Sequence, residues 1–202
     1  MPRRTSFLRV ISDVDTRTRG YIPHWNLESA TYAVTFRLHG SLPREVVERL
    51  REERRARKST ALENMHLRAE FEQRVDARLH EQTDVAWMND ARIANIVARA
   101  LLHFDTERYE LHAWCVMPNH VHVVVTPLAP WTLAEIIHSW KSYSSTAANK
   151  LLGRTGKFWS REYFDRIIRD EEDLSDSILY VLGNPGKAGL ENWRWTSTSW
   201  NA

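Results

Sequence analysis

The chain has 202 residues, of which 43% are hydrophobic and 27% are charged, and its formal net charge at pH 7 is +2. This length and composition predict one globular domain over residues 1–202. No stretch is apolar over the length that spans a bilayer, and the basic N-terminus lacks the apolar region of a secretory signal. Because Cys115 is the only cysteine, the chain cannot form an internal disulfide. We therefore expect a cytoplasmic protein that does not bind membranes.

The first half of the chain predicts one strand between two polar segments. Residues 1–20 are polar and have no regular period, so we expect an irregular N-terminal arm. Thr31–Leu38 alternates like a half-buried strand. From about 44 to 82 the chain is dense in Arg and Glu, which predicts a charged helical insertion. Its second half has apolar residues at every fourth position, namely Leu67, Phe71, Val75 and Leu79.

The second half of the chain alternates helices and strands. Asp90 can cap a helix whose apolar residues repeat at helical spacing up to Phe104. The elements expected after it are strands over 109–117 and 119–125, a helix from Thr132 to about Leu152, a strand over 163–169, and a helix from Glu171 that ends at Gly183-Asn184-Pro185. This order predicts an α+β fold, an antiparallel sheet of split β-α-β (ferredoxin-like) type with helices packed on it.

The triplet His120-Val121-His122 is the most informative pattern of the sequence. Alternate side chains of a strand leave the same face, so the two imidazoles are expected side by side while Val121 points the other way. Neutral imidazole is the commonest protein ligand for a divalent metal. Two partly buried histidines that hydrogen-bond to the backbone would show the same triplet, and the triplet alone leaves both interpretations open.

The last expected helix carries a tyrosine and an amide on one side. Tyr180 lies off the apolar stripe of this helix, and Asn184 follows it by one turn. A phenol and a side-chain amide can supply a nucleophile and a metal ligand together. An ordinary helix tyrosine with a C-terminal Asn cap is the alternative interpretation.

Cations and aromatic residues alternate between Arg154 and Arg169. The net charge is too small to predict nucleic-acid binding by itself, but cations neutralise phosphates and aromatic rings stack on unpaired bases. The pattern predicts contact with single-stranded or hairpin nucleic acid, although Arg166 and Arg169 could instead pair with Asp165 or Asp170. The nominated contacts are Lys141, Arg154, Lys157, Trp159, Arg161, Arg166, Arg169 and Lys187. By contrast, Trp193, Trp195 and Trp200 are expected to close the hydrophobic core.

Several short motifs stand in an order that resembles the REP-associated tyrosine transposases, which belong to the single-tyrosine HUH transposase group. The motifs are Pro118-Asn119-His120-Val121-His122, Trp140-Lys141-Ser142, Gly156-Lys157-Phe158-Trp159, Tyr163-Phe164-Asp165-Arg166-Ile167-Ile168-Arg169 and Asn184-Pro185-Gly186-Lys187-Ala188-Gly189-Leu190. The segments 21–25 and 30–38 resemble the same family, so the likeness covers most of the chain. Gly186 departs from the family, which more often has a β-branched residue there.

The resemblance implies roles for individual residues. His120 and His122 would hold a divalent cation, Mg²⁺ or Mn²⁺, with Asn184 as the third protein ligand and Tyr180 as the nucleophile. The implied activity is that of a single-stranded DNA endonuclease and strand transferase, which acts near DNA hairpins through a covalent 5′-phosphotyrosine intermediate. Such a protein would work in the cytoplasm with the nucleoid, as a monomer or a homodimer.

Two other functions remain open at this point. The first is a metal-dependent phosphodiester hydrolase in which activated water attacks and Tyr180 only positions the substrate. The second is a hairpin DNA-binding protein without catalysis. The sequence identifies no base that would take the proton of the Tyr180 phenol.

Overall fold

The computed structural model describes residues 15–18, 23–26, 30–43, 45–49, 52, 74–81 and 84–199. Its centre is a five-stranded antiparallel sheet in the order β6-β3-β5-β4-β7. The strands are β3 (Tyr32–Leu38), β4 (Tyr109–Val116), β5 (His120–Pro127), β6 (Trp159–Ile167) and β7 (Thr196–Thr198). The last predicted strand therefore begins four residues earlier than the expected 163.

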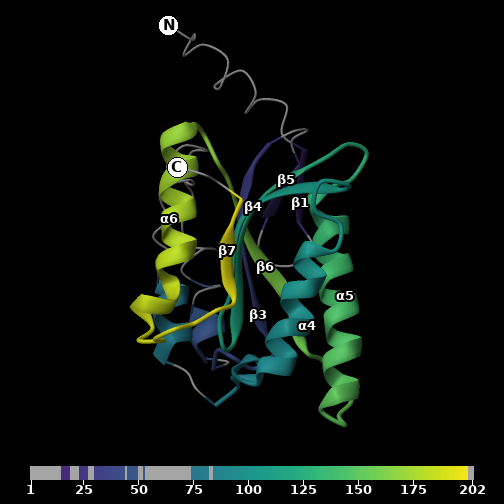
Figure 1. Cartoon of the computed structure of the whole chain (residues 1–202), viewed down its shortest axis with the longest axis vertical. Helices are drawn as coiled ribbons and strands as arrows, with labels where there is room; N and C mark the ends of the chain where they lie inside the picture. Colours follow the sequence, from purple (N-terminus) through teal and green to yellow (C-terminus); the bar gives the residue numbers. More distant parts are fainter. Residues whose placement is uncertain are drawn as a thin grey trace, which may run out of the picture.

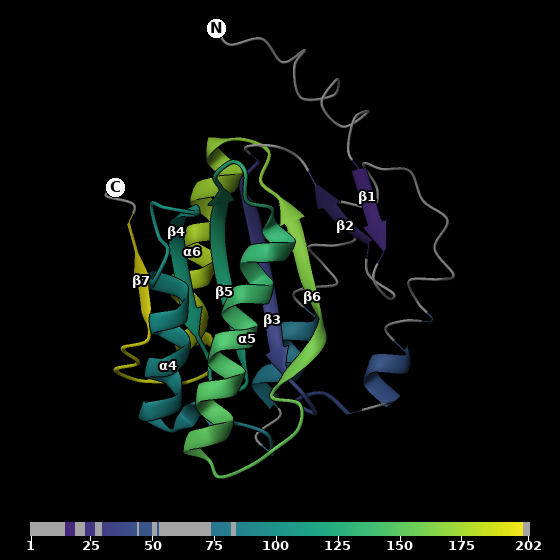
Figure 2. The same ribbon diagram turned by 90° about the vertical axis from the view of Figure 1, so that its right-hand side faces the viewer.

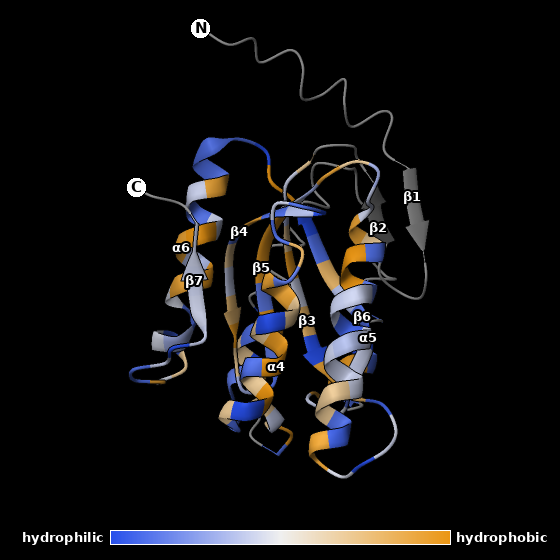
Figure 3. Cartoon of the chain, turned by 45° about the vertical axis from the view of Figure 1, so that its right-hand side comes forward, coloured by the Kyte–Doolittle hydropathy of each residue, from blue (hydrophilic) through white to orange (hydrophobic). Residues whose placement is uncertain are grey.

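Helices cover both faces of this sheet. Helices α4 (Ala91–Leu102) and α5 (Leu133–Leu151) lie side by side on one face, and α6 (Glu171–Lys187) lies on the other (Figures 1 and 2). Hydrophobic and hydrophilic segments alternate along all three helices (Figure 3), as expected of helices with one buried face. The predicted α+β fold, an antiparallel sheet with helices packed on it, is confirmed.

Local side-chain chemistry explains where these helices begin. The Asp90 side chain accepts a hydrogen bond from the backbone N–H of Arg92, and Thr132 forms a reciprocal capping box with Glu135. Both predicted helix starts are therefore confirmed. The side chain of Asp170 caps α6 in the same way, and the acidic first turn of α6 suits the helix dipole.

The predicted end of α6 at Gly183-Asn184-Pro185 is wrong, because the helix continues to Lys187 with Pro185 inside it. A proline removes one intrahelical donor, yet the chain beyond it can stay helical where later donors are satisfied. Here the backbone N–H groups of Ala188 and Leu190 both donate to the carbonyl of Pro185. The last turn of α6 therefore survives and carries Lys187 past the proline.

Outside the main sheet, β1 (Asp15–Thr18) and β2 (Pro23–Asn26) pair as a two-stranded antiparallel sheet. The expectation of an irregular arm is therefore wrong for residues 15–18. A short 3₁₀ helix, η2 (Trp87–Asn89), precedes α4. In the predicted insertion, residues 45–49 and 74–81 are helical, whereas 53–73, with Leu67 and Phe71, lie outside the described residues.

The two faces of β5 carry different chemistry because its side chains alternate. Val121, Val123 and Val125 join the large hydrophobic core beneath α4 and α5. Val124 packs with residues of α6 on the other face, to which His120 and His122 also point. Both faces of β5 are buried because helices cover both faces of the sheet.

The remaining features of the fold are the C-terminal tryptophans and the character of the helices. Trp193 and Trp195 pack against the hydrophobic clusters, as expected, while Trp200 lies outside the described residues. Among the residues that the structure describes, no helix is both long and apolar enough to cross a lipid bilayer.

Candidate active site

The site begins with the histidine pair on the central strand. His120 and His122 are 0% and 2% exposed, and their Nε2 atoms lie 2.9 Å apart. Two nitrogens that each bind one cation at about 2.1 Å, at right angles, lie about 3 Å from each other. The two rings thus leave the same face of the sheet, as the strand alternation predicts, and their spacing suits chelation of a single ion.

Neighbouring side chains orient both rings. The amide nitrogen of Asn119 donates to the carbonyl of Leu79 at 2.7 Å, so its oxygen faces His120 Nδ1, at 2.6 Å. His120 Nδ1 therefore carries the proton and its Nε2 keeps a lone pair. The Thr35 hydroxyl, opposite on β3, contacts His122 Nδ1 at 2.9 Å and can fix the same tautomer there. Nε2 lone pairs that face each other at this distance repel unless a cation lies between them.

The electrostatics of the pair favour the form that binds metal. Burial lowers the pKa of His120 well below its ordinary value, and the nearby His122 and His80 lower it further. Burial also lowers the pKa of His122, which the Asp76 carboxylate opposes. Both imidazoles are therefore neutral at pH 7, and neutral imidazole is the ligand form.

A carboxylate that sequence reasoning missed completes this group. Asp76, on the 74–81 helix, is 3% exposed, and its Oδ2 lies 3.7 Å from His122 Nε2. One ligand atom from each of Asp76, His120 and His122 lies within 4.8 Å of the others, so the three could hold a metal ion. In the sequence Asp76 is one acid among many in a charged segment. The signal that could have singled it out is its place next to Val75, on the apolar side of an amphipathic helix.

Helix α6 brings the tyrosine and the amide to the same place. The Tyr180 hydroxyl donates to Asp76 Oδ2 at 2.5 Å, and its ring centroid lies 5.8 Å from that of His122. Asn184 is fully buried, and its amide nitrogen donates to the backbone carbonyl of Tyr180. The ammonium of Lys187 lies 3.9 Å over the Tyr180 ring, where it can stabilise negative charge on the phenol oxygen.

Unpartnered polar atoms test whether this site fits a cation. Among the described residues, five buried side-chain atoms have no hydrogen-bond partner, and three of them, Asp76 Oδ1, Asn184 Oδ1 and His80 Nε2, belong to residues around the histidine pair. Leaving such an atom unpaired costs about 1–3 kcal/mol. Carboxylate oxygen, amide oxygen and imidazole nitrogen are all ligands for divalent cations. The donor set around His120 and His122 therefore fits a divalent metal.

Comparison with known proteins finds a family that matches part of the chain. The family described as "Transposase IS200 like" matches residues 87–181, which include both histidines and Tyr180. Residues 87–181, just under half of the chain, are similar to the IS200-like transposase family.

Individual relatives are also similar to part of the chain. The REP-associated tyrosine transposase of Escherichia coli K12 is 25% identical over an alignment of 97 residues, which covers 46% of this chain and 55% of the relative. A Haemophilus influenzae protein assigned to the same family is 22% identical over 106 residues, 44% of this chain and 58% of the relative. The chain thus matches a little over half the length of these relatives. The resemblance seen in the motifs is confirmed.

A solved structure supports the fold. The structure of a REP-associated tyrosine transposase bound to a REP hairpin superposes with a TM-score of 0.51 and 16% identity, over 86% of this chain and 79% of that chain. At this identity the likeness concerns the fold alone.

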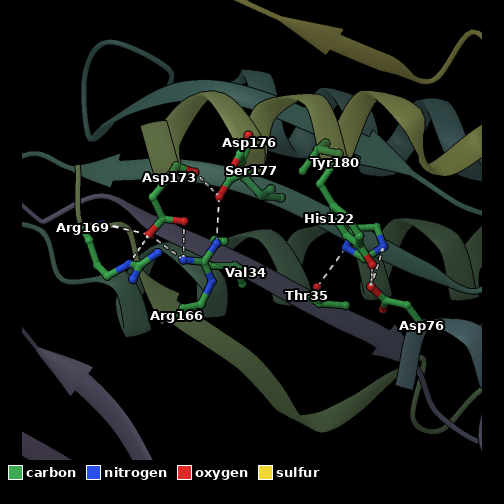
Figure 4. Close-up of a pocket in the computed structure, with 13 residues that line it drawn as sticks. Val34, Thr35, Asp76, His122, Arg166, Arg169, Asp173, Asp176, Ser177 and Tyr180 are labelled. Carbon is green, nitrogen blue, oxygen red and sulfur yellow. Dashed lines mark hydrogen bonds and ion pairs between the residues drawn. The ribbon is translucent and has the colours of Figure 1, made fainter. Parts of the chain in front are cut away.

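A groove of about 250 Å³ extends from the site along α6. Figure 4 shows Asp76, His122 and Tyr180 toward one end of it and Arg166, Arg169 and Asp173 toward the other. Arg166 Nη1 donates to both carboxylate oxygens of Asp173, at 2.7 and 2.8 Å, and Arg169 Nε donates to the same group at 3.1 Å. The acidic partner of both arginines is therefore Asp173 rather than Asp165 or Asp170.

The net charge of the arginine cluster depends on how Arg166 and Arg169 pair with Asp173. Burial alone would raise the pKa of Asp173, but hydrogen bonds from Arg166 and Arg169 bring it below its ordinary value. Two guanidinium groups share one carboxylate, so Arg166, Arg169 and Asp173 together keep a net positive charge, and the exposed Asp176 carboxylate lines the same groove. A phosphate in the groove would meet that charge.

The other nominated DNA contacts lie apart from Tyr180. The Lys141 ammonium, on α5 across the sheet, donates to the carbonyls of Ser160, Arg161 and Glu162, and burial lowers its pKa to about 7. Arg154 stacks on the Trp87 ring at 4.8 Å. Lys157 and Arg161 are exposed.

The prediction that Trp159 stacks on DNA bases is wrong. Its side chain is buried in the hydrophobic core, and its indole N–H donates to Ser144 Oγ at 2.9 Å. Trp159 is 7% exposed and lies in T-shaped contact with Phe36 and Phe158, so its ring has no open face for a base.

Proposed function

We propose that this protein is a metal-dependent single-stranded DNA endonuclease and strand transferase that acts near DNA hairpins, with Tyr180 as its nucleophile. One observation carries the proposal. The Tyr180 hydroxyl, from α6, and the His120–His122 pair, from β5, meet at the same carboxylate, Asp76. An ordinary surface tyrosine would have no reason to lie against a buried pair of neutral histidines.

In this proposal His120, His122 and Asn184 hold a divalent cation, Mg²⁺ or Mn²⁺. Such an ion, when bound, withdraws charge from phosphorus and orients the scissile phosphate. The protein prepares the ligands, since Asn119 and Thr35 direct both imidazoles and burial keeps them neutral. The unpartnered oxygen of Asn184 supports its role as a ligand.

Tyr180 performs the covalent step. Its oxygen attacks the phosphate and forms a phosphotyrosine with the 5′ phosphate, while the bond to the 3′ oxygen breaks and leaves a free 3′ hydroxyl. A 3′ hydroxyl from another strand can reverse the attack, and no ATP is needed because the linkage conserves the energy of the phosphodiester. Lys187 stabilises the charge that develops on the phenol oxygen.

The proposed substrate is a DNA hairpin with a single-stranded flank. The groove beside Tyr180 and the positive Arg166–Arg169 cluster support a single strand along α6, and the exposed Lys157 and Arg161 are proposed as outer contacts. The relative of similar fold is a transposase bound to a REP hairpin. Because Tyr180 reaches the histidines within one chain, the reaction needs no second protomer. A DNA-acting role would place the protein with the nucleoid.

A gel assay tests this function against its two alternatives. The chain is incubated with Mn²⁺ and a pool of hairpin oligonucleotides that carry a 3′ label and single-stranded flanks. We expect a labelled band that survives denaturation, which is absent in Tyr180→Phe and retained in Glu172→Gln, a change at an exposed acid on the same helix. Cleavage without an adduct would instead indicate a water-activating hydrolase, and binding without cleavage would indicate a hairpin-binding protein.

A further inference from the structure

The 74–81 helix reaches the site from outside the matched family region, which begins at residue 87. We propose that Asp76 is an additional ligand of the cation and that its second oxygen holds the Tyr180 hydroxyl, so that the insertion completes the catalytic centre. The identities of the cation and the nucleophile rest on the function proposed above.

The two carboxylate oxygens have different surroundings. Asp76 Oδ2 accepts the hydrogen bond from Tyr180 and lies 3.7 Å from His122 Nε2. Asp76 Oδ1 is buried and has no hydrogen-bond partner in the described part of the chain. A carboxylate bridging a cation and a hydroxyl would satisfy both oxygens, because one oxygen can bind metal while the other accepts a proton donor.

The burial of the Asp76 carboxylate also favours a bound cation. Asp76 is almost fully buried, and its ion-pair contact among the described residues is with the equally buried His122. An ionised carboxylate in such surroundings is strongly unfavourable unless it is paired or coordinates a metal. A divalent ion between His120, His122 and Asp76 would provide the missing positive charge.

The helix that presents Asp76 is held firmly. Val75 and Leu79 are buried with Leu42 and Phe164, and the Leu79 carbonyl accepts the amide hydrogen bond from Asn119. Asn119 also contacts His120 Nδ1, so one side chain fixes both the orientation of the His120 ring and the position of the 74–81 helix. A carboxylate placed by packing and by a hydrogen bond to the histidine motif is pre-organised as a ligand.

Metal titration without DNA tests the role of Asp76. Mn²⁺ binding to the full-length chain is measured by calorimetry for the parent, Asp76→Asn, Tyr180→Phe and Asp176→Asn. Asp176 lines the same groove and is exposed, so its change removes one charge without touching the proposed ligands. We expect Asp76→Asn to weaken Mn²⁺ binding by about tenfold or more and the two other variants by less than about threefold. Equal affinities for Asp76→Asn and Asp176→Asn would overturn the proposal.

A second measurement needs no variant and guards against misfolding of Asp76→Asn. Anomalous diffraction from Mn²⁺-soaked crystals of the parent chain locates the ion directly. We expect an Asp76 oxygen within about 2.0–2.3 Å of it. An ion bound by the histidines with both Asp76 oxygens beyond bonding distance would refute the ligand role.

The two proposals fail separately. If Mn²⁺ binding depends on Asp76 but no hairpin forms an adduct, the endonuclease function is wrong and the ligand assignment stands. If the adduct forms at Tyr180 and Asp76→Asn binds Mn²⁺ like the parent, the assignment of Asp76 is wrong and the function stands.

Discussion

Asn119 offers a sharp test of how the site is held together, because its side chain makes two buried hydrogen bonds. It donates to the Leu79 carbonyl at 2.7 Å and contacts His120 Nδ1 at 2.6 Å, and the residue is 2% exposed. Asn119→Ala leaves one buried acceptor and one buried donor unpaired. At about 1–3 kcal/mol for each, we expect the free energy of unfolding to fall by about 2–6 kcal/mol.

The same change should weaken metal binding. Loss of the partner of a ligating histidine typically lowers metal affinity about 10–100-fold, and we expect Mn²⁺ binding by Asn119→Ala to fall within that range. Urea denaturation followed by tryptophan fluorescence measures the stability, and calorimetry measures the affinity.

A matched control isolates the effect of burial. Asn149 is half-buried, and its amide nitrogen donates one exposed hydrogen bond, to the Gly156 carbonyl at 2.9 Å. Asn149→Ala should lower the free energy of unfolding by about 1 kcal/mol or less and leave Mn²⁺ affinity unchanged. If the Asn119 and Asn149 variants are equally stable and bind Mn²⁺ equally, Asn119 does not connect the insertion to the histidine motif.

Three further predictions concern Tyr180, the histidine pair and Trp159. Tyr180→Phe should abolish the covalent DNA adduct while retaining Mn²⁺ binding in calorimetry, and loss of both would count against a purely nucleophilic role. The lowered pKa values of His120 and His122 mean that the unfolded chain binds more protons below its histidine pKa of about 6.5. Stability should therefore be full above that pH and decline as pH falls below it, in urea denaturation at pH 5 and 7. The double change of His120 and His122 to Gln should flatten this dependence, and an unchanged slope would contradict the assignment. Trp159→Phe should lower the free energy of unfolding by about 1–3 kcal/mol and leave hairpin binding unaltered in a gel shift, whereas weaker binding by a folded variant would return Trp159 to the DNA interface.

Local patterns in the sequence predicted most of the sheet and of the three long helices. Strand alternation is a property of neighbouring residues, so it placed His120 and His122 on one face before any packing was known. Helix starts at Asp90 and Thr132 depend on contacts two or three residues away, and they too were predicted correctly. The end of α6 was not predicted correctly. Whether a helix continues past Pro185 depends on which backbone groups around the proline find hydrogen-bond partners.

Only the tertiary structure determined which side chains far apart in the sequence contact one another. Asp76 and Tyr180 are 104 residues apart, and no periodicity connects a charged insertion with the last helix. Trp159 is a second example. Its aromatic and basic neighbours in the sequence suggested an exposed DNA contact, but in the folded chain its side chain packs in the core. By itself the sequence determined the elements and the pair of histidines on one strand face. The fold determined their partners, because burial and long-range contacts belong to the packed chain and not to any local segment.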